Sequence, residues 1–250
     1  MSNEGSELAP VAGAADRAPM VRAMFNRIAP KYDVTNRVLS LGLDQVWRRQ
    51  AIKSLDWAQE GEVLDLCAGT MDLTCMLVEG GARHVWAVDF SEGMLEAGKA
   101  KLPEGAPVTA LVGDARDLPL EDNSVDGIIA GFGLRNVPDL HLAIAECARV
   151  LRVGGRLVVL DFFRPVSLPS KLLQGTYNRF IVPIVGGVIT GFGDAYKYLN
   201  TSIDAFLSRE EFEQLLAEHG LVPSGKEMFP PVASRVDATK VAPGAVDGNS

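Results

Sequence analysis

The sequence predicts an α/β fold built on a doubly wound, mostly parallel sheet of seven strands. Short apolar runs alternate with helical segments through the middle of the chain, as expected for βαβ units. Residues 63–70 form a buried strand that ends at a small-residue turn and leads into a helix. In addition, Asp65, Asp89 and Asp114 stand at the ends of three successive predicted strands. Parallel strand ends line one edge of a sheet, so we expect one ligand site there.

The elements are expected in the following order. Two or three helices occupy 18–55. Strands are predicted near 62–67, 84–89, 107–112, 125–130 and 155–162, with helices near 71–79, 91–101 and 138–152. A helix at 208–219 and a hairpin-like pair of strands at 221–228 and 232–241 complete the sheet. The helix at 138–152 should stop at 154–155, two glycines that are typical of a helix C-terminus.

The chain is expected to form one domain over 17–241, between disordered tails at 1–16 and 242–250 that are rich in small and polar residues. Residues 167–200 interrupt the strand–helix pattern. Their apolar stretch at 180–192 is too short to span a bilayer and holds a proline and three glycines. It either packs into the core or forms a helical lid over a greasy substrate. We favour the lid, because insertions after a strand end lie over the ligand crevice.

Charge and cysteine usage restrict the partners. A net charge of −8 argues against nucleic acid. Residues 17–53 nevertheless hold eight basic and two acidic residues, a net of +6, so the rest carries −14. This segment is either a solvated helix face or a surface drawn to anionic lipid. The three cysteines lack metal-ligand spacing and suit a reducing compartment, and no signal segment is recognised. We therefore expect a cytoplasmic protein without a metal site, in peripheral contact with the membrane at most; the oligomeric state stays open.

The turn after the first strand indicates a nucleoside cofactor that has no pyrophosphate. Asp89 follows Gly69 by 20 residues, the spacing at which a carboxylate accepts hydrogen bonds from a ribose. The turn has one glycine where a dinucleotide fingerprint needs three, which disfavours NAD. Three carboxylates at one sheet edge also suit a positively charged sulfonium. Taken alone, the turn is equally consistent with an ordinary strand–helix connection.

Several specific stretches carry a family resemblance. They are 24–33 (Met-Phe-Asn-Arg-Ile-Ala-Pro-Lys-Tyr-Asp), 39–42 (Leu-Ser-Leu-Gly), 47–48 (Trp-Arg), 72–74 (Asp-Leu-Thr), 132–137 (Phe-Gly-Leu-Arg-Asn-Val) and 198–199 (Tyr-Leu). With the cofactor turn, they resemble the ubiquinone/menaquinone biosynthesis C-methyltransferases, a family of class I S-adenosylmethionine-dependent enzymes. The resemblance covers about residues 20–220. It implies a Rossmann-like methyltransferase fold, S-adenosylmethionine as cofactor, and a polyprenylated hydroquinone as acceptor, with demethylmenaquinol becoming menaquinol.

The resemblance and the strand ends together predict the site residues. The expected cofactor-binding residues are Tyr32, Asp65, Gly69, Thr70, Asp89, Asp114 and Ala115. Arg135 is expected to stabilise the phenolate form of the acceptor, since a guanidinium cannot serve as a base, and Asn136 to orient the ring. A salt bridge to a nearby Asp is the alternative role for Arg135. Asp194 and Tyr196 are weaker candidates on the substrate side, and Tyr32 is either a cover over the cofactor or a core aromatic.

Two differences from the family pattern leave alternative functions open. Met71 stands where the family usually has glycine, and we expect it to crowd the methionine end of the cofactor. Residues 232–238 replace a Val-Ala-Leu-His-like run. The alternatives are methylation of a phospholipid amine or an aromatic secondary metabolite, or a silent binding module that keeps the methyltransferase fold.

Overall fold

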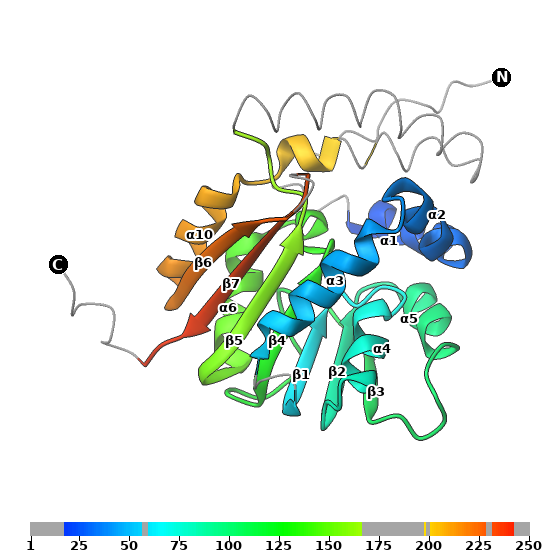
Figure 1. The fold of residues 1–250 in the computed structure, drawn as a ribbon, viewed down its shortest axis with the longest axis horizontal. Helices are drawn as coiled ribbons and strands as arrows, with labels where there is room; N and C mark the ends of the chain where they lie inside the picture. Colours follow the sequence, from blue (N-terminus) through cyan, green and yellow to red (C-terminus); the bar gives the residue numbers. More distant parts are fainter. Residues whose placement is uncertain (1–17, 57–59, 167–197, 199–200, 229–231, 243–250) are drawn as a thin grey trace.

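A seven-stranded sheet organises the molecule. The computed structural model describes residues 18–56, 60–166, 198, 201–228 and 232–242. The strand order is β3-β2-β1-β4-β5-β7-β6 (Figure 1). The strands are β1 (Glu62–Leu66), β2 (His84–Asp89), β3 (Val108–Val112), β4 (Val125–Gly131), β5 (Leu151–Asp161), β6 (Leu221–Glu227) and β7 (Ser234–Lys240). The first five run parallel, and β7 is antiparallel to both β5 and β6. The predicted doubly wound, mostly parallel fold is confirmed.

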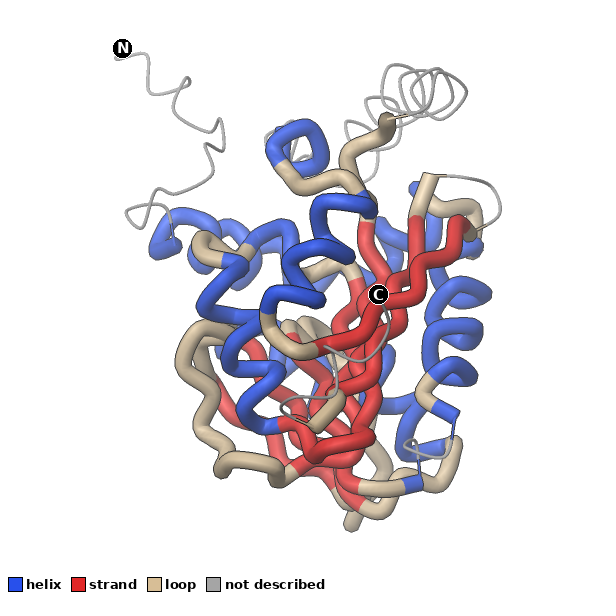
Figure 2. Tube along the Cα trace, turned by 90° about the vertical axis from the view of Figure 1, so that its left-hand side faces the viewer, coloured by secondary structure: helices blue, strands red, loops and turns tan. Residues whose placement is uncertain are grey.

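Helices cover both faces of this sheet (Figure 2). One face packs against α3 (Leu43–Ser54) and α4 (Asp72–Glu79), and further along against α5 (Glu92–Lys99). The other face packs against α6 (Leu140–Val150) and α10 (Arg209–Glu218). Neighbouring strand residues serve opposite layers: Val158 lies in the α3 and α4 layer, and Val159 in the α6 and α10 layer. Because successive side chains of a strand point to opposite faces of the sheet, continuous apolar strands contribute to a separate apolar core on each face.

The N-terminal segment forms three helices and a short 3-10 turn, as the sequence predicts. These elements are α1 (Ala18–Ile28), η2 (Ala29–Lys31), α2 (Tyr32–Leu39) and the already named α3. Asn26 ties α1 to the start of α5, because its Oδ1 accepts hydrogen bonds from the Ser91 hydroxyl at 2.6 Å and the Gly93 N–H at 3.0 Å. The helix α1 is thereby held over the carboxyl ends of the first strands.

The end of α6 differs from the prediction. This helix begins as expected at Asp139, whose Oδ1 accepts from the Leu142 N–H at 3.1 Å. It ends at Val150, and β5 starts at the next residue. Val125 of β4 lies opposite Leu151, while Gly127 lies opposite Arg156, so β5 loops out between them. Gly154, with φ of 81°, provides the left-handed conformation for this bulge rather than a helix cap.

Several predictions fall outside the described residues. They concern the tails at 1–16 and 243–250 and the lid at 167–200, of which the structure describes only Tyr198. Across the part of the chain that is described, no helix has the length and apolar character needed to cross a bilayer.

Candidate active site

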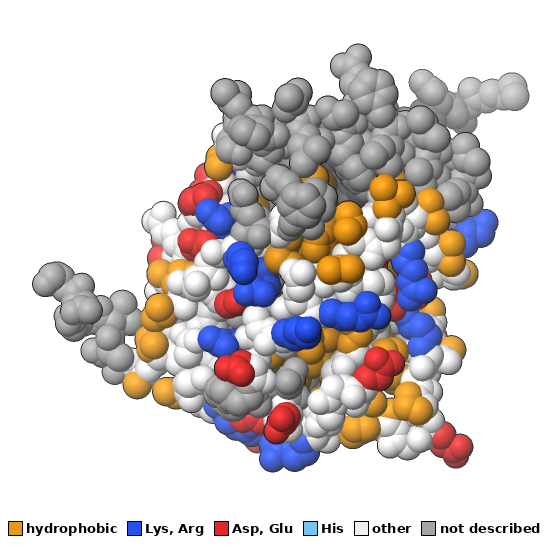
Figure 3. Space-filling model, viewed as in Figure 1, with side chains coloured by type: hydrophobic (Ala, Val, Ile, Leu, Met, Phe, Trp, Pro, Cys, Tyr) orange, Lys and Arg blue, Asp and Glu red, His pale blue; other side chains and the backbone are white. Residues whose placement is uncertain are grey.

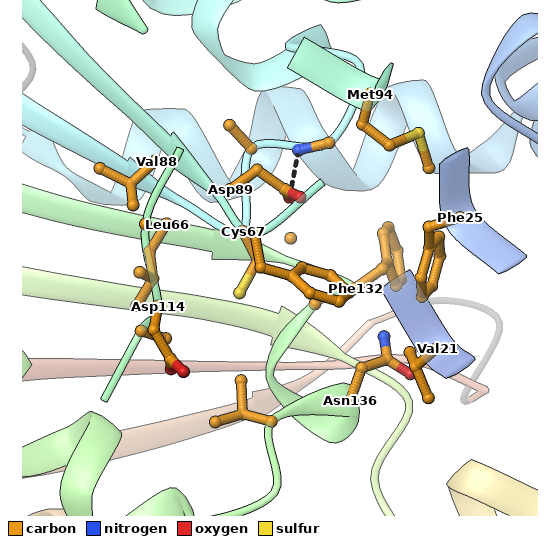
Figure 4. A pocket seen from close by; sticks show the side chains of 18 of the residues that line it. Val21, Phe25, Leu66, Cys67, Val88, Asp89, Met94, Asp114, Phe132 and Asn136 are labelled. Carbon is orange, nitrogen blue, oxygen red and sulfur yellow. Dashed lines mark hydrogen bonds between the residues drawn. The ribbon is translucent and has the colours of Figure 1, made fainter. Parts of the chain in front are cut away.

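A pocket opens at the carboxyl ends of the parallel strands. About 910 Å³ of space is free of protein atoms here, including the open solvent at its mouth. Its floor comes from the loop after β1, the end of β2, and the turns after β3 and β4. Side chains of the N-terminal helices close one side, with Val21 and Phe25 of α1 facing Phe132 and Asn136 across the space (Figure 4).

Asp89 is the acidic centre of the pocket. Its Oδ2 accepts a hydrogen bond from the Gly69 N–H at 2.8 Å (Figure 4). Its Oδ1 accepts from the Ser91 N–H at 2.8 Å. The side chain is almost fully buried, and this burial raises the pKa of Asp89 although both N–H groups oppose the shift. Each carboxylate oxygen has a second lone pair. Asp89 can therefore accept two further hydrogen bonds from a ligand diol.

The loop after β1 is tightly curled around this carboxylate. Every second residue of this loop has a positive φ: 57° at Cys67, 53° at Gly69 and 61° at Met71. Left-handed backbone at two non-glycine positions is strained, and such strain is concentrated at functional loops. The curl turns the Gly69 N–H towards Asp89. Gly133 packs directly on this loop, and any Cβ at that position would overlap the Cβ of Cys67. Two turns from different strands therefore form one wall.

Asp114 and Ala115 lie at the end of the pocket formed by the turn after β3. Asp114 shares its carboxylate with Arg116, at 3.0 Å from Nε to Oδ1 and 2.6 Å from Nη2 to Oδ2. Hydrogen bonding to Arg116 lowers the pKa of Asp114. Ala115 is buried in the wall. This end thus combines a fixed carboxylate with an apolar backbone turn, a combination that suits a flat heterocycle.

Asp65, in contrast, does not line the pocket. Because side chains alternate along β1, Leu66 faces the pocket wall while the Asp65 carboxyl points to the α4 side, where it accepts a hydrogen bond from the Thr74 hydroxyl at 2.6 Å. Burial raises the pKa of Asp65 to about 7, and its Oδ1 has no hydrogen-bond partner among the described residues. The expectation that all three strand-end carboxylates surround one ligand is therefore wrong for this one.

Met71 does not crowd the pocket either. Its side chain is fully buried in a small apolar cluster with Ala87 and Leu95, on the α5 side of the sheet. It packs so closely on α5 that a Cβ at Gly98 would lie 2.6 Å from the Met71 Cγ. The φ of 61° directs the side chain away from the ligand space. The Met71 side chain therefore lies outside the lining of the pocket.

An ionic network fastens the N-terminal helices to the pocket loop. Asp33 of α2 accepts a hydrogen bond from the Thr70 hydroxyl and pairs with Lys101 Nζ at 2.8 Å. Lys101 also contacts Asp72 at 2.6 Å. Partial burial would raise the pKa of Asp72, but Lys101 and Arg48 outweigh it and the pKa is lowered. Thr70 thus serves as an anchor for α2. Tyr32, next to Asp33 at the start of α2, lines the pocket, and its role over the cofactor stays a prediction.

Arg48 of α3 is a pocket residue to which the sequence analysis assigned no role. It is buried, lies over the Phe132 ring at 5.2 Å from its centroid, and pairs weakly with Asp44 at 3.8 Å. Its position in the Trp47-Arg48 stretch of the family pattern is the only sequence signal that could have identified it.

Arg135 forms the salt bridge that the sequence left as its alternative role. Its Nη1 lies 2.7 Å from Asp161 Oδ1 and also donates to the Phe132 carbonyl. Burial would lower the pKa of the Arg135 guanidinium, but the Asp161 carboxylate together with Tyr32 and Tyr198 outweighs this effect and raises it. Arg135 stands behind the pocket wall and does not line the pocket. Its expected action on a phenolate stays a prediction.

Asn136 follows Arg135 in the short 3-10 helix η4 (Leu134–Asn136) and does line the pocket. Its buried Oδ1 has no hydrogen-bond partner within the described part of the chain (Figure 4). An unpartnered buried acceptor at a pocket wall calls for a ligand donor. Asp194 and Tyr196 lie outside the described residues. Among those residues, no group of His, Cys, Asp and Glu could hold a metal ion.

A family model for the ubiE/COQ5 methyltransferase family matches residues 13–230. This chain belongs to that family. A ubiquinone/menaquinone biosynthesis C-methyltransferase UbiE from Geobacter sulfurreducens is 39% identical over 210 residues, which cover 82% of each chain. A demethylmenaquinone methyltransferase from Staphylococcus aureus is 37% identical over 204 residues, covering 81% of this chain and 85% of the relative. The family that the sequence motifs indicate is confirmed.

Solved structures support the fold of this ubiE/COQ5 family member. A SAM-dependent methyltransferase from Thermotoga maritima has a TM-score of 0.62 at 22% identity, covering 87% of this chain and 99% of that one. Another from Aquifex aeolicus has a TM-score of 0.60 at 17% identity, covering 88% and 98%. At such identities the likeness concerns the fold alone.

The buried Asp65 predicts a pH-dependent stability. Below about pH 4, the carboxyl is protonated in both the folded and the unfolded chain. Between about pH 4 and 7, only the folded chain keeps the proton. The free energy of unfolding therefore falls as the pH rises through this range, by up to ~4 kcal/mol. Asp65→Asn should therefore gain stability relative to the native chain at pH 8 but not at pH 4. Urea unfolding at both pH values measures this, with the exposed Asp204→Asn as control. A constant difference between native and D65N chains would contradict the assignment.

Met71→Gly should destabilise the fold without improving cofactor binding. The lost side chain leaves a cavity worth about 2–4 kcal/mol, offset by about 1 kcal/mol from relief of the positive φ. Thermal unfolding and titration with S-adenosylmethionine, the cofactor that the sequence predicts, measure the two effects. Met94→Ala is the matched control, because Met94 is equally buried but lines the pocket and should weaken binding as well. Tighter binding by M71G would mean that Met71 reaches the cofactor.

Proposed function

We propose that this protein uses S-adenosylmethionine to methylate a ring carbon of a polyprenylated hydroquinone, with demethylmenaquinol as the acceptor. The observation that carries the proposal is the Asp89 pocket, found at the strand ends of a ubiE/COQ5 family member. The names of the relatives from Geobacter sulfurreducens and Staphylococcus aureus support the quinone precursor as acceptor.

The residues present fit this cofactor. Asp89 offers two buried acceptors for the ribose hydroxyls, and the turn at Asp114 and Ala115 offers a place for the adenine. The loop residues Gly69 and Thr70 also line the pocket and would hold the methionine portion. The pocket has no glycine-rich cradle for a pyrophosphate, but it has carboxylates, which suit a cationic sulfonium. When bound, the cofactor supplies an electrophilic methyl carbon.

The chain's task is then to place the acceptor ring and to favour its phenolate. Tyr32 and Phe25, which meet edge to face at 6.1 Å, exclude water from the cofactor side. The Asn136 Oδ1 accepts a hydrogen bond from a ring hydroxyl and orients the ring carbon towards the methyl group. After transfer, that carbon loses its proton to solvent through a bound water.

Arg135 acts from behind the wall in this proposal. With Asp161 it fixes the Phe132 carbonyl and the turn that presents Asn136, so it is a positioning residue. Its charge is close enough to Tyr32 for the phenol to influence the pKa of Arg135. A phenolate beside Tyr32 would experience the same charge, reduced by the Asp161 partner.

The difference from the family pattern at residues 232–238 no longer supports the alternative acceptors. Residues 234–238 belong to β7, whose Val236 and Ala238 pack into the core, and none of them lines the pocket. Peripheral contact with an anionic membrane is part of the proposal, because the acceptor is a lipid and residues 17–53 carry a net charge of +6. The cytoplasmic location stays a prediction.

Removal of Asp89 should abolish tight cofactor binding. Asp89→Ala deletes both acceptors for the ribose and should raise the Kd for S-adenosylmethionine about 100-fold, equivalent to ~2.7 kcal/mol. Asp114→Ala, whose carboxylate is shared with Arg116, should raise it only about 10-fold. Calorimetric titration with thermal melts as a folding check measures both. An unchanged Kd for D89A would overturn the assignment of Asp89 to the ribose, whereas no cofactor binding by the native chain would favour the silent binding module.

Methyl transfer to demethylmenaquinol in detergent tests the reaction itself. The native chain should form menaquinol from labelled cofactor. Asn136→Ala should lower kcat about 10- to 100-fold with an unchanged Kd for the cofactor, because ring orientation is lost. Arg135→Ala would leave Asp161 buried without its cation and would destabilise the fold by about 3–5 kcal/mol. Arg135→Lys keeps the charge and is the better variant; its kcat should lie between those of the native chain and Asn136→Ala. Cofactor binding without any product would overturn the acceptor.

A further inference from the structure

The exposed charge of the N-terminal helices has one sign. Between residues 18 and 54, six charged side chains are exposed and all are basic; these are Arg22, Arg27, Lys31, Arg37, Arg49 and Lys53. Neither of the two acidic residues of the segment is exposed. Asp44 is buried, and the half-buried Asp33 pairs with Lys101. Figure 3 shows basic side chains gathered over α3 on one face, with apolar side chains next to them. The chain as a whole carries −8, so this concentration is local.

Exposed apolar side chains gather on the same helices. Ten large apolar side chains are exposed among the described residues, and five of them lie between Met20 and Val46. Val34, Val38 and Leu41 are 61%, 36% and 79% exposed. Scattered exposed apolar residues are normal, but a cluster among basic residues indicates an interaction surface.

These side chains lie on α2 and at its two ends. Val34 and Val38 are four residues apart on α2, with Arg37 beside them. Lys31 is the last residue of η2, directly before α2, and Leu41 lies in the turn that follows α2. The opposite side of α2 is buried through Thr35 and Leu39. We call Lys31, Val34, Arg37, Val38 and Leu41 the α2 face. Apolar residues bordered by cations are typical of helices that lie in the interface of a membrane.

We propose that the α2 face binds the surface of an anionic lipid bilayer. Its basic residues complement lipid phosphates, while its three aliphatic side chains enter the headgroup boundary. A second copy of the chain is disfavoured as the occupant. A symmetric dimer through this face would place like charges against each other.

The location of the face gives the contact a purpose. Tyr32 of the same helix and Phe25 of the preceding one line the pocket from the inner side. A bilayer against the outer side would therefore lie close to the pocket, so that a lipid acceptor could pass from the membrane to the site over a short path. Membrane contact and this purpose rest on the proposed function, whereas the assignment of the contact to the α2 face goes beyond it.

Sedimentation with vesicles tests the contact. The native chain should bind phosphatidylcholine vesicles that contain phosphatidylglycerol, bind pure phosphatidylcholine weakly, and lose affinity at high salt. The triple variant Val34→Ser, Val38→Ser, Leu41→Ser should lower the partition coefficient at least about 10-fold. The double variant Lys31→Gln, Arg37→Gln should lower the partition coefficient on anionic vesicles about 5-fold for each removed charge. Its binding to pure phosphatidylcholine should be unchanged.

Matched controls come from exposed residues elsewhere. Val112→Ser, Leu142→Ser and Val222→Ser remove side chains that are 50%, 52% and 50% exposed. Arg83→Gln with Lys226→Gln removes two exposed charges from β6 and the loop before β2. All controls should sediment as the native chain does. Thermal melts check that each variant is folded.

A kinetic arm separates this inference from the proposed function. With acceptor embedded in anionic vesicles, the α2-face triple variant should show a KM raised about 10-fold, while its kcat with acceptor in detergent is unchanged. Vesicle binding that depends on the α2 face, without methyl transfer, would leave the membrane contact standing and overturn the acceptor.

Two results would overturn the membrane contact. The first is equal vesicle binding by the α2-face triple and its control triple. The second is a native dimer, measured by light scattering, that becomes a monomer in the α2-face variant while vesicle binding persists. The latter outcome would assign the face to a contact between copies of the chain.

Discussion

The Asp89 carboxylate is the constraint on which the site depends. It ends β2, and its two oxygens accept from Gly69 in the loop after β1 and from Ser91 at the start of α5. Two strand-end turns are thereby held in one geometry by a single buried anion. Such a carboxylate is stable only because backbone N–H groups replace the lost water. The strained φ values of Cys67 and Met71 belong to the same arrangement, since the loop must curl to bring the Gly69 N–H to Asp89.

The N-terminal helices extend this constraint to the outside of the molecule. Asp33 and Lys101 tie α2 to Thr70 and Asp72 of the pocket loop, and Asn26 ties α1 to α5. One side of these helices therefore closes the pocket, and the other side is left to solvent with a basic and apolar surface. A single short segment would thus connect the proposed cofactor site to the proposed lipid-binding surface.

Burial explains why Asp65 and Arg135 contact protein groups in the structure. Asp65 and Arg135 were expected to meet ligands, but both are enclosed by protein and find partners in Thr74 and Asp161. Arg135 still bears on the site through the turn that carries Asn136. Asp65 is expected to affect stability rather than binding, because burial raises its pKa to about 7. In both cases the pattern of residue types was informative, and the direction of the side chain decided the role.

The sequence by itself determined the fold class, the family, and the pocket residues Tyr32, Gly69, Asp89, Asp114 and Asn136. It could do so because strand and helix periodicities, turn residues and strand-end acids are local features that survive without coordinates. Tertiary structure alone decided the direction of Asp65 and Met71, since one residue of strand phase or one left-handed φ sends a side chain to the opposite layer. It also decided the pairing of Arg135 with Asp161, 26 residues away, and the place of Arg48 at the pocket. These contacts join elements that are distant along the chain, and only their packing brings them within reach of one another.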